Sequence, residues 1–286
     1  MLQYIKMIII SIFSGVMFPL PVSSAAHYSL LADVMSFSKS EEELGFYFSV
    51  FMLVFSVVVF IFLRKIYTKA LKTLFVTDKA KLKEQKLTAY KKVMNNILLS
   101  LIPVIFLFIP ISKDSLIIDY FDKFLTKNGF ILTTFACLIN ALVLVISIWY
   151  TRQNNAPYKR VPETKNVVRM AVYQLISYIV PGFSHISSGS VNLLINDVHP
   201  RVIARDVYLY LAPQMFLVGL VRLVRSLVVD FVFDPILIII AVAFSAASCA
   251  IVVYFTGKFN IRKLLGFFSI YSVLLGVVFA VATFVA

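Results

Sequence analysis

Long apolar runs recur along the chain, and each is long enough to cross a lipid bilayer as a helix. One crossing needs about 20 predominantly apolar residues. A transmembrane β-barrel would instead show segments of about ten residues with alternating hydrophobicity, a pattern that this chain lacks. The pattern therefore predicts an all-α integral membrane protein with six spans, at residues 44–64, 94–112, 129–150, 203–223, 233–256 and 262–284.

Two further apolar stretches are interrupted by polar, helix-breaking residues. They are "IIISIFSGVMFPLPVSSAAHYSLL" (8–31) and "VVRMAVYQLISYIVPGFSHISSGSVNLLI" (167–195). Each contains a proline followed three residues later by a serine, Pro21 with Ser24 and Pro181 with Ser184. Non-helical backbone does not face lipid, because each unpaired backbone group costs several kcal/mol there. We therefore expect each stretch to enter the membrane and return to the same face, as re-entrant hairpins over residues 8–38 and 167–196.

The order of hairpins and spans predicts two halves with opposite orientations. Residues 1–150 and 151–286 each hold one interrupted stretch followed by three spans. If the hairpins add no crossing, three spans separate the two breaks, and an odd number of crossings inverts the second half. Inverted repeats whose broken helices meet near the bilayer midplane are typical of transporters.

The charge distribution supports this topology. The chain has 27 basic and 14 acidic residues, and ten of the basic residues fall between Arg64 and Lys92. Basic residues concentrate in cytoplasmic loops, so the basic segment 64–93 is predicted to be cytoplasmic and both termini to be outside. This placement favours topology and contact with anionic lipid over nucleic acid as the reason for the charge.

Cysteine and histidine contribute little to the prediction. Cys137 and Cys249 both lie inside predicted spans, which favours packing over a disulfide. The three histidines, His27, His185 and His199, show no metal-ligand spacing. We therefore expect no metal site and no cofactor, with a divalent cation needed only if the protein is an active hydrolase.

The first interrupted stretch allows a second interpretation. "KMIIISIFSGVMFPLPVSSAA" (6–26) also resembles a signal peptide, with a lysine, an apolar core and small residues suited to cleavage. The matching motif at 181–190 favours retention, because a discarded segment has no reason to resemble an internal one.

The polar breaks have the chemistry of an anion site. A break exposes the N-terminus of the following helix, whose free N–H groups and dipole favour anions, phosphate above all. Serines add donors, and a protonated histidine adds charge. The predicted phosphate-binding residues are Ser23, Ser24, His27, Ser184, His185, Ser187 and Ser188. The alternative is that the serines merely cap helices and the histidines are hydrogen-bonded core residues.

The same two motifs resemble a known family. "LPVSSAAH" (20–27) and "PGFSH" (181–185) are similar to the signatures E-x-x-x-E-F-L-P-x-S-S-T-G-H and P-G-x-S-R-S-G-x-T of the undecaprenyl-diphosphate phosphatases, the integral-membrane bacitracin-resistance type. The similarity extends along most of the chain. It implies inverted repeats with two re-entrant helix pairs in the bacterial inner (cytoplasmic) membrane. It also implies removal of one phosphate from a C55 polyprenyl diphosphate carrier.

The resemblance fails at several family residues. Ser23, Ser24, His27 and Ser184 match the motifs, but Ser14 and Phe18 occupy the positions of the two glutamates, His185 that of the arginine and Gly189 that of the threonine. Phosphoryl transfer needs a group that positions or deprotonates the nucleophile and cations that hold the transferring charge. Histidine does not reproduce the bidentate fork of arginine. The remaining carboxylates that could lie in the membrane are Asp33, Asp197 and Asp206.

Three functional hypotheses follow. The first is a catalytically degenerate relative that binds, and could translocate, a polyprenyl (undecaprenyl) phosphate or diphosphate in a mid-membrane pocket. The second is an active undecaprenyl-diphosphate phosphatase with a rearranged site, in which His27 and Ser24 are the catalytic residues. The third is a membrane subunit of a larger complex with a vestigial site. In that case the basic segment 64–92 is a candidate docking surface for its partners. The sequence leaves homo-oligomerisation open.

Overall fold

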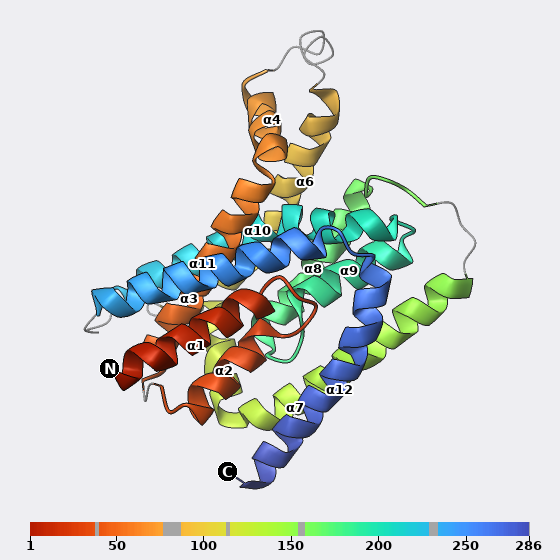
Figure 1. Ribbon diagram of the computed structural model, residues 1–286. Helices are drawn as coiled ribbons and strands as arrows, with labels where there is room; N and C mark the ends of the chain where they lie inside the picture. The colour runs from red at the N-terminus through yellow and green to blue at the C-terminus, as the bar shows by residue number, and fades with distance from the viewer. Residues whose placement is uncertain (38–39, 77–86, 113–114, 154–157, 229–233, 286) are drawn as a thin grey trace.

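The computed structural model describes residues 1–37, 40–76, 87–112, 115–153, 158–228 and 234–285 (Figure 1). Within these ranges the chain is helical and contains no β-strand. The helices are α1 (Leu2–Met17), α2 (Ser24–Val34), α3 (Glu41–Phe62), α4 (Arg64–Phe75), α6 (Thr88–Ile105), the 3-10 turn η1 (Phe106–Phe108), α7 (Ile117–Gln153), α8 (Thr164–Ile179), α9 (His185–Ile195), α10 (Pro200–Ser226), α11 (Pro235–Thr256) and α12 (Ile261–Val285).

Six of the described helices are long and apolar enough to cross a membrane, as predicted. The stretches that qualify are Glu42–Phe62, Thr88–Phe108, Gly129–Arg152, Pro200–Ser226, Pro235–Thr256 and Ile261–Ala282. The predicted boundaries are least accurate for the second span, which begins at Thr88 rather than residue 94 and ends at Phe108 rather than residue 112. Its first turns are polar, and a helix continues past the apolar region as long as its backbone bonds are satisfied. Pro110 follows its end, and proline disfavours a further helical turn because it has no backbone N–H to donate.

Each interrupted stretch forms two short helices joined by a non-helical turn. The first break (residues 18–23) separates α1 from α2, and the second break (residues 180–184) separates α8 from α9. Gly182 is essential to the second break, because its φ of +107° is rarely adopted by other residues. An added Cβ there would also lie 2.6 Å from Cβ of Ala136 and 2.8 Å from the carbonyl oxygen of Thr133.

The two halves of the chain interlock. α3 packs along α10, and α7 packs along α12 (Figure 1). The short helix α1 packs on α11 of the second half, and α8 packs on α6 of the first half. The α1–α11 contact is so close that a Cβ at Gly15 would overlap the hydroxyl of Ser248 and the carbonyl of Ser245. Small residues at a helix contact permit such close packing in membranes.

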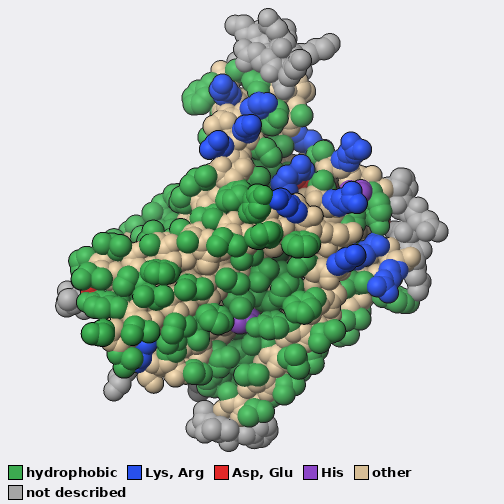
Figure 2. Space-filling view, in the orientation of Figure 1, with side chains coloured by type: hydrophobic (Ala, Val, Ile, Leu, Met, Phe, Trp, Pro, Cys, Tyr) green, Lys and Arg blue, Asp and Glu red, His purple; other side chains and the backbone are tan. Residues whose placement is uncertain are grey.

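Basic residues mark one end of the molecule. Figure 2 shows Lys and Arg side chains gathered there, while apolar side chains cover the flanks. We call this the basic end; it comprises α4, the first turns of α6, the start of α8 and the loop between α11 and α12. α4 and the start of α6 project beyond the helical body at this end (Figure 1). That this end faces the cytoplasm, with both termini on the other side, stays a prediction.

Candidate functional site

The two breaks meet inside the molecule. The Gly182 backbone N–H donates a hydrogen bond to the Ser23 hydroxyl over 2.9 Å. The Ser187 hydroxyl, in the first turn of α9, donates to the Pro21 carbonyl over 2.8 Å. These bonds join segments 159 and 166 residues apart in the sequence. We call this contact between the breaks the junction.

The serines at the junction also cap the helices that follow. The Ser23 hydroxyl accepts from the Ala26 N–H at 3.3 Å, and the Ser184 hydroxyl accepts from the Ser187 N–H at 3.2 Å. These bonds satisfy N–H groups that a helix start otherwise leaves free. Ser24 differs from Ser23. Its side chain is buried, and its hydroxyl forms no hydrogen bond with another described residue. Ser24, the first residue of α2, therefore differs from Ser23 in having a hydroxyl that is not used in the contact between the breaks.

His27 is held on both sides of its ring. Its Nδ1 lies 2.6 Å from the Ser23 carbonyl oxygen, and its Nε2 lies 2.6 Å from the Tyr271 hydroxyl of α12. A carbonyl only accepts hydrogen bonds, so Nδ1 carries the hydrogen, and in the neutral ring Nε2 accepts from the tyrosine. The ring also stacks on that of Tyr271, with centroids 5.5 Å apart. His27 would have to leave Tyr271 before its Nε2 could act as a base.

His185 is enclosed by its own helix pair. Its ring centroid lies 4.1 Å from that of Tyr178, and its side chain is buried. Its carbonyl accepts from Gln174, whose side-chain oxygen in turn accepts from Gln214 at 3.2 Å. Nδ1 of His185 has no hydrogen-bond partner among the described residues. His185 thus belongs to a buried polar chain that connects α9, α8 and α10.

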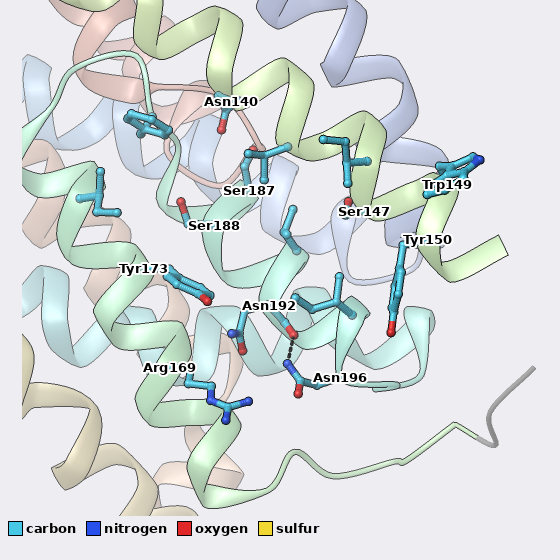
Figure 3. Close-up of a pocket in the computed structure, with 16 residues that line it drawn as sticks. Asn140, Ser147, Trp149, Tyr150, Arg169, Tyr173, Ser187, Ser188, Asn192 and Asn196 are labelled. Carbon is cyan, nitrogen blue, oxygen red and sulfur yellow. Dashed lines mark hydrogen bonds between the residues drawn. The ribbon is translucent and has the colours of Figure 1, made fainter. Parts of the chain in front are cut away.

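A cavity of about 650 Å³ lies beside the second break, between α7, α8 and α9 (Figure 3). Of the predicted residues, only Ser187 and Ser188 line it. The lining polar residues that sequence reasoning missed include Arg169, Tyr173, Asn192 and Asn196. One signal was available for them: polar residues within apolar membrane helices are costly and often functional.

The lining of the cavity is mostly apolar, with a few polar groups at its ends. Apolar side chains come from α7, α8, α9 and the second break: Val143, Ile146, Trp149, Ile176, Phe183, Val191 and Ile195. Pockets of this size and character are typical of sites for small amphiphilic ligands.

The three carboxylates that the sequence placed in the membrane do not line this cavity. Asp206 is buried and forms a salt bridge with Arg205, with 2.7 Å between Oδ1 and a guanidinium nitrogen. Arg205 thus compensates the charge of this buried carboxylate. Asp33 is exposed near the end of α2, and neither it nor Asp197 lines the cavity.

The two positions that hold glutamate in the family signature are packed. Ser14 is buried in α1, the helix that contacts α11. Phe18 is also buried, with its ring centroid 5.5 Å from that of Phe48 and 6.1 Å from that of Phe55. An aromatic cluster thus surrounds the second of these positions.

The donor set at the junction does not suit a divalent cation. Magnesium prefers carboxylate and phosphate oxygens, but the junction offers serine hydroxyls and one histidine with both nitrogens bonded. Among the described residues, no group of three His, Cys, Asp or Glu side chains could hold a metal.

Comparison with known proteins places the chain in a family. The family model of the bacitracin resistance protein BacA matches residues 7–278, nearly the whole chain. A search of curated proteins found no significant match. Proteins of this family lie in the bacterial inner membrane and act on a polyprenyl diphosphate lipid. The chain is thus a multi-pass membrane protein that belongs to the bacitracin resistance protein BacA family, the family of undecaprenyl-diphosphate phosphatases.

Proposed function

We propose that this protein binds a polyprenyl (undecaprenyl) phosphate or diphosphate, with the head group at the junction. The observation that carries the proposal is the pair of hydrogen bonds that bring the two breaks together, Gly182 to Ser23 and Ser187 to Pro21. This contact joins the residues that precede α2 to those at the start of α9, and a cavity lies beside the second break. Helix N-termini favour anions such as phosphate.

The packing of the helices supports the inverted-repeat part of the proposal. Each half, 1–150 and 151–286, holds one short helix pair and three spans, and the contacts between halves are reciprocal. α1 of the first half packs on α11, as α8 of the second half packs on α6. In the proposed topology both short pairs are re-entrant and approach from opposite faces. Such an arrangement would let the protein translocate the lipid head between the faces.

The surroundings of the first break support loss of hydrolysis. Phe18 replaces a signature glutamate and packs in an aromatic cluster. His27 has both nitrogens bonded. The described residues place no carboxylate at the junction to position a nucleophile, so the site retains binding groups while His27 is engaged on both ring nitrogens. We therefore propose a catalytically degenerate member, a lipid binder rather than a phosphatase.

The competing function is hydrolysis of the polyprenyl diphosphate, and one observation favours it. The family match covers residues 7–278, and Ser24 and His27 keep the family residue types. In this alternative, His27 and Ser24 would supply nucleophile and base in either order.

One experiment separates the two functions. The purified protein is given C55 diphosphate with and without magnesium, and both phosphate release and lipid binding are measured. We expect saturable binding with no release above background, and binding weakened several-fold in Ser24→Ala. The matched control is Ser29→Ala on the same helix, whose hydroxyl is exposed and bonds only to its own helix.

Two outcomes would contradict the proposal. Phosphate release that disappears in His27→Ala would make the protein an active phosphatase. Failure to bind any polyprenyl phosphate would support the third hypothesis, a subunit whose site is vestigial and whose partners do the work.

A further inference from the structure

The cavity is elongated and joins two polar regions. Ser187 and Ser188 line it at the start of α9, and Ile195 lines it at the end of the same helix. At about 1.5 Å per residue, these positions lie about 12 Å apart along the helix axis. α8 runs in the opposite direction, with Ile176 near the break and Arg169 toward the basic end. One end of the cavity is therefore the junction, and the other lies at the basic end.

The outer end of the cavity has an exposed arginine and two asparagine side chains. Arg169 is exposed and forms no ion pair with a described carboxylate. Asn192 is 1% exposed, and its side-chain oxygen has no partner among the described residues. Figure 3 shows Arg169, Tyr173, Asn192 and Asn196 gathered in this part of the cavity. The side-chain amide of Asn196 donates to the backbone carbonyl of Asn192 at 2.8 Å, which holds the two residues side by side.

The flank of the cavity is suited to a lipid chain. Ile146 and Ile176 line it and remain 51% and 44% exposed, so this wall is open to the surrounding bilayer. Trp149 and Tyr150 line it toward the end of α7 and are 60% and 49% exposed. Tryptophan and tyrosine concentrate at the membrane–water interface. The cavity thus runs from the interface at the basic end toward the junction.

We infer that the outer end of the cavity is a second head-group site, in which Arg169 binds the phosphate of an amphiphile. A guanidinium presents paired N–H donors that match phosphate oxygens. The amides of Asn192 and Asn196 offer further polar contacts, and the chain of the amphiphile lies along Ile146 and Ile176. This site lies on the side of the junction that faces the basic end. It goes beyond the proposed function, because it requires phosphate on a lipid but no contact with the first break.

The single tryptophan of the chain provides a direct readout, because it lines this cavity. Protein in phosphatidylcholine nanodiscs is titrated with C55 phosphate while Trp149 fluorescence is recorded. We expect a saturable change whose apparent Kd rises about tenfold or more in Arg169→Gln, as for loss of a charge-assisted hydrogen bond. The apparent Kd of Arg169→Lys should lie between that of the parent protein and that of Arg169→Gln. The matched control is Arg201→Gln, another exposed arginine that lies outside the cavity lining.

Two further probes identify the ligand class. C55 alcohol, which lacks the phosphate, should bind weakly and equally to the parent protein and to Arg169→Gln. Inorganic phosphate should compete with C55 phosphate only at far higher concentrations. Equal competition by inorganic phosphate would overturn the inference in favour of a small-anion site, and an unchanged Kd in Arg169→Gln would overturn it altogether.

The same titration separates this inference from the proposed function. If Ser24→Ala weakens binding and Arg169→Gln does not, the junction site stands and the outer site fails. If only Arg169→Gln weakens binding, the outer site stands and the junction fails as a head-group site. Weakening by both variants supports two positions for one lipid along the cavity.

Discussion

The first and second breaks use the same backbone device in different surroundings. Each interrupts an apolar helix, and each is followed by a helix capped by a serine, Ser23 in one and Ser184 in the other. Aromatic rings pack around the first break, where Phe18 contacts Phe48 and Phe55. The second break borders the 650 Å³ cavity. A motif thus supplies helix ends, while the residues packed around it decide whether a ligand can reach them.

The largest expected effect comes from placing a carboxylate at the first break. Phe18→Glu would put an acid without a described partner among aromatic rings, and we expect it to destabilise the protein by about 4 kcal/mol or more. The measurement is unfolding in detergent, with Phe18→Leu as the control, expected to cost under about 1.5 kcal/mol. Equal stability of the two variants would show that water reaches position 18. The contrast between a packed first break and a second break beside a cavity would then not hold.

The next effect concerns the backbone of the second break. Gly182→Ala should destabilise by about 2–4 kcal/mol, because it combines an unfavourable positive φ with overpacking against Ala136 and Thr133. Gly45→Ala is the control, since nothing lies within 4 Å of an added Cβ there. If both variants unfold alike, the second break does not depend on close packing against α7.

A smaller effect tests the bond between the breaks. Ser187→Ala removes the donor to the Pro21 carbonyl and leaves that buried acceptor unpaired, which should cost about 1–3 kcal/mol. Ser226→Ala is the control, because its hydroxyl bonds only to Leu223 of its own helix. Unfolding in detergent measures both. A Ser187→Ala protein as stable as the parent would mean that the junction contributes little to the fold.

The smallest effect lies outside the membrane, at the loop before α8. Hydrogen bonds from Lys159 and Lys165 lower the pKa of Glu163 to about 2. A lowered pKa in the folded state stabilises the protein above the ordinary value near 4.5, and this contribution is lost as pH falls from there toward 2. Because the pair is exposed, Glu163→Gln should change the thermal midpoint little at neutral pH. A large loss would mean that this loop holds α8 and the second break in place.

Much of the fold could be predicted from the sequence. Membrane spans depend on the length and hydrophobicity of a local segment, so all six were found, with errors of a few residues at their ends. The breaks were also found, because Pro21, Pro181 and Gly182 impose their backbone restrictions wherever they occur.

The candidate site was predicted only in part. Proximity of the two breaks was expected from the repeat, and the bonds from Gly182 to Ser23 and from Ser187 to Pro21 confirm it. That the predicted residues bind phosphate stays a prediction. The cavity-lining residues Arg169 and Asn192 were missed, because no motif marks them and three helices bring them together.

The local sequence is therefore enough to specify a helical membrane protein with two polar breaks in apolar stretches, since each property depends on neighbouring residues. The packing of the folded chain is what brings Tyr271 to His27, surrounds Phe18 with aromatic rings and leaves a cavity beside α9. Tyr271 and His27 are 244 residues apart in the chain. Which side chains fill a space depends on contacts between such distant segments, and no local pattern encodes them.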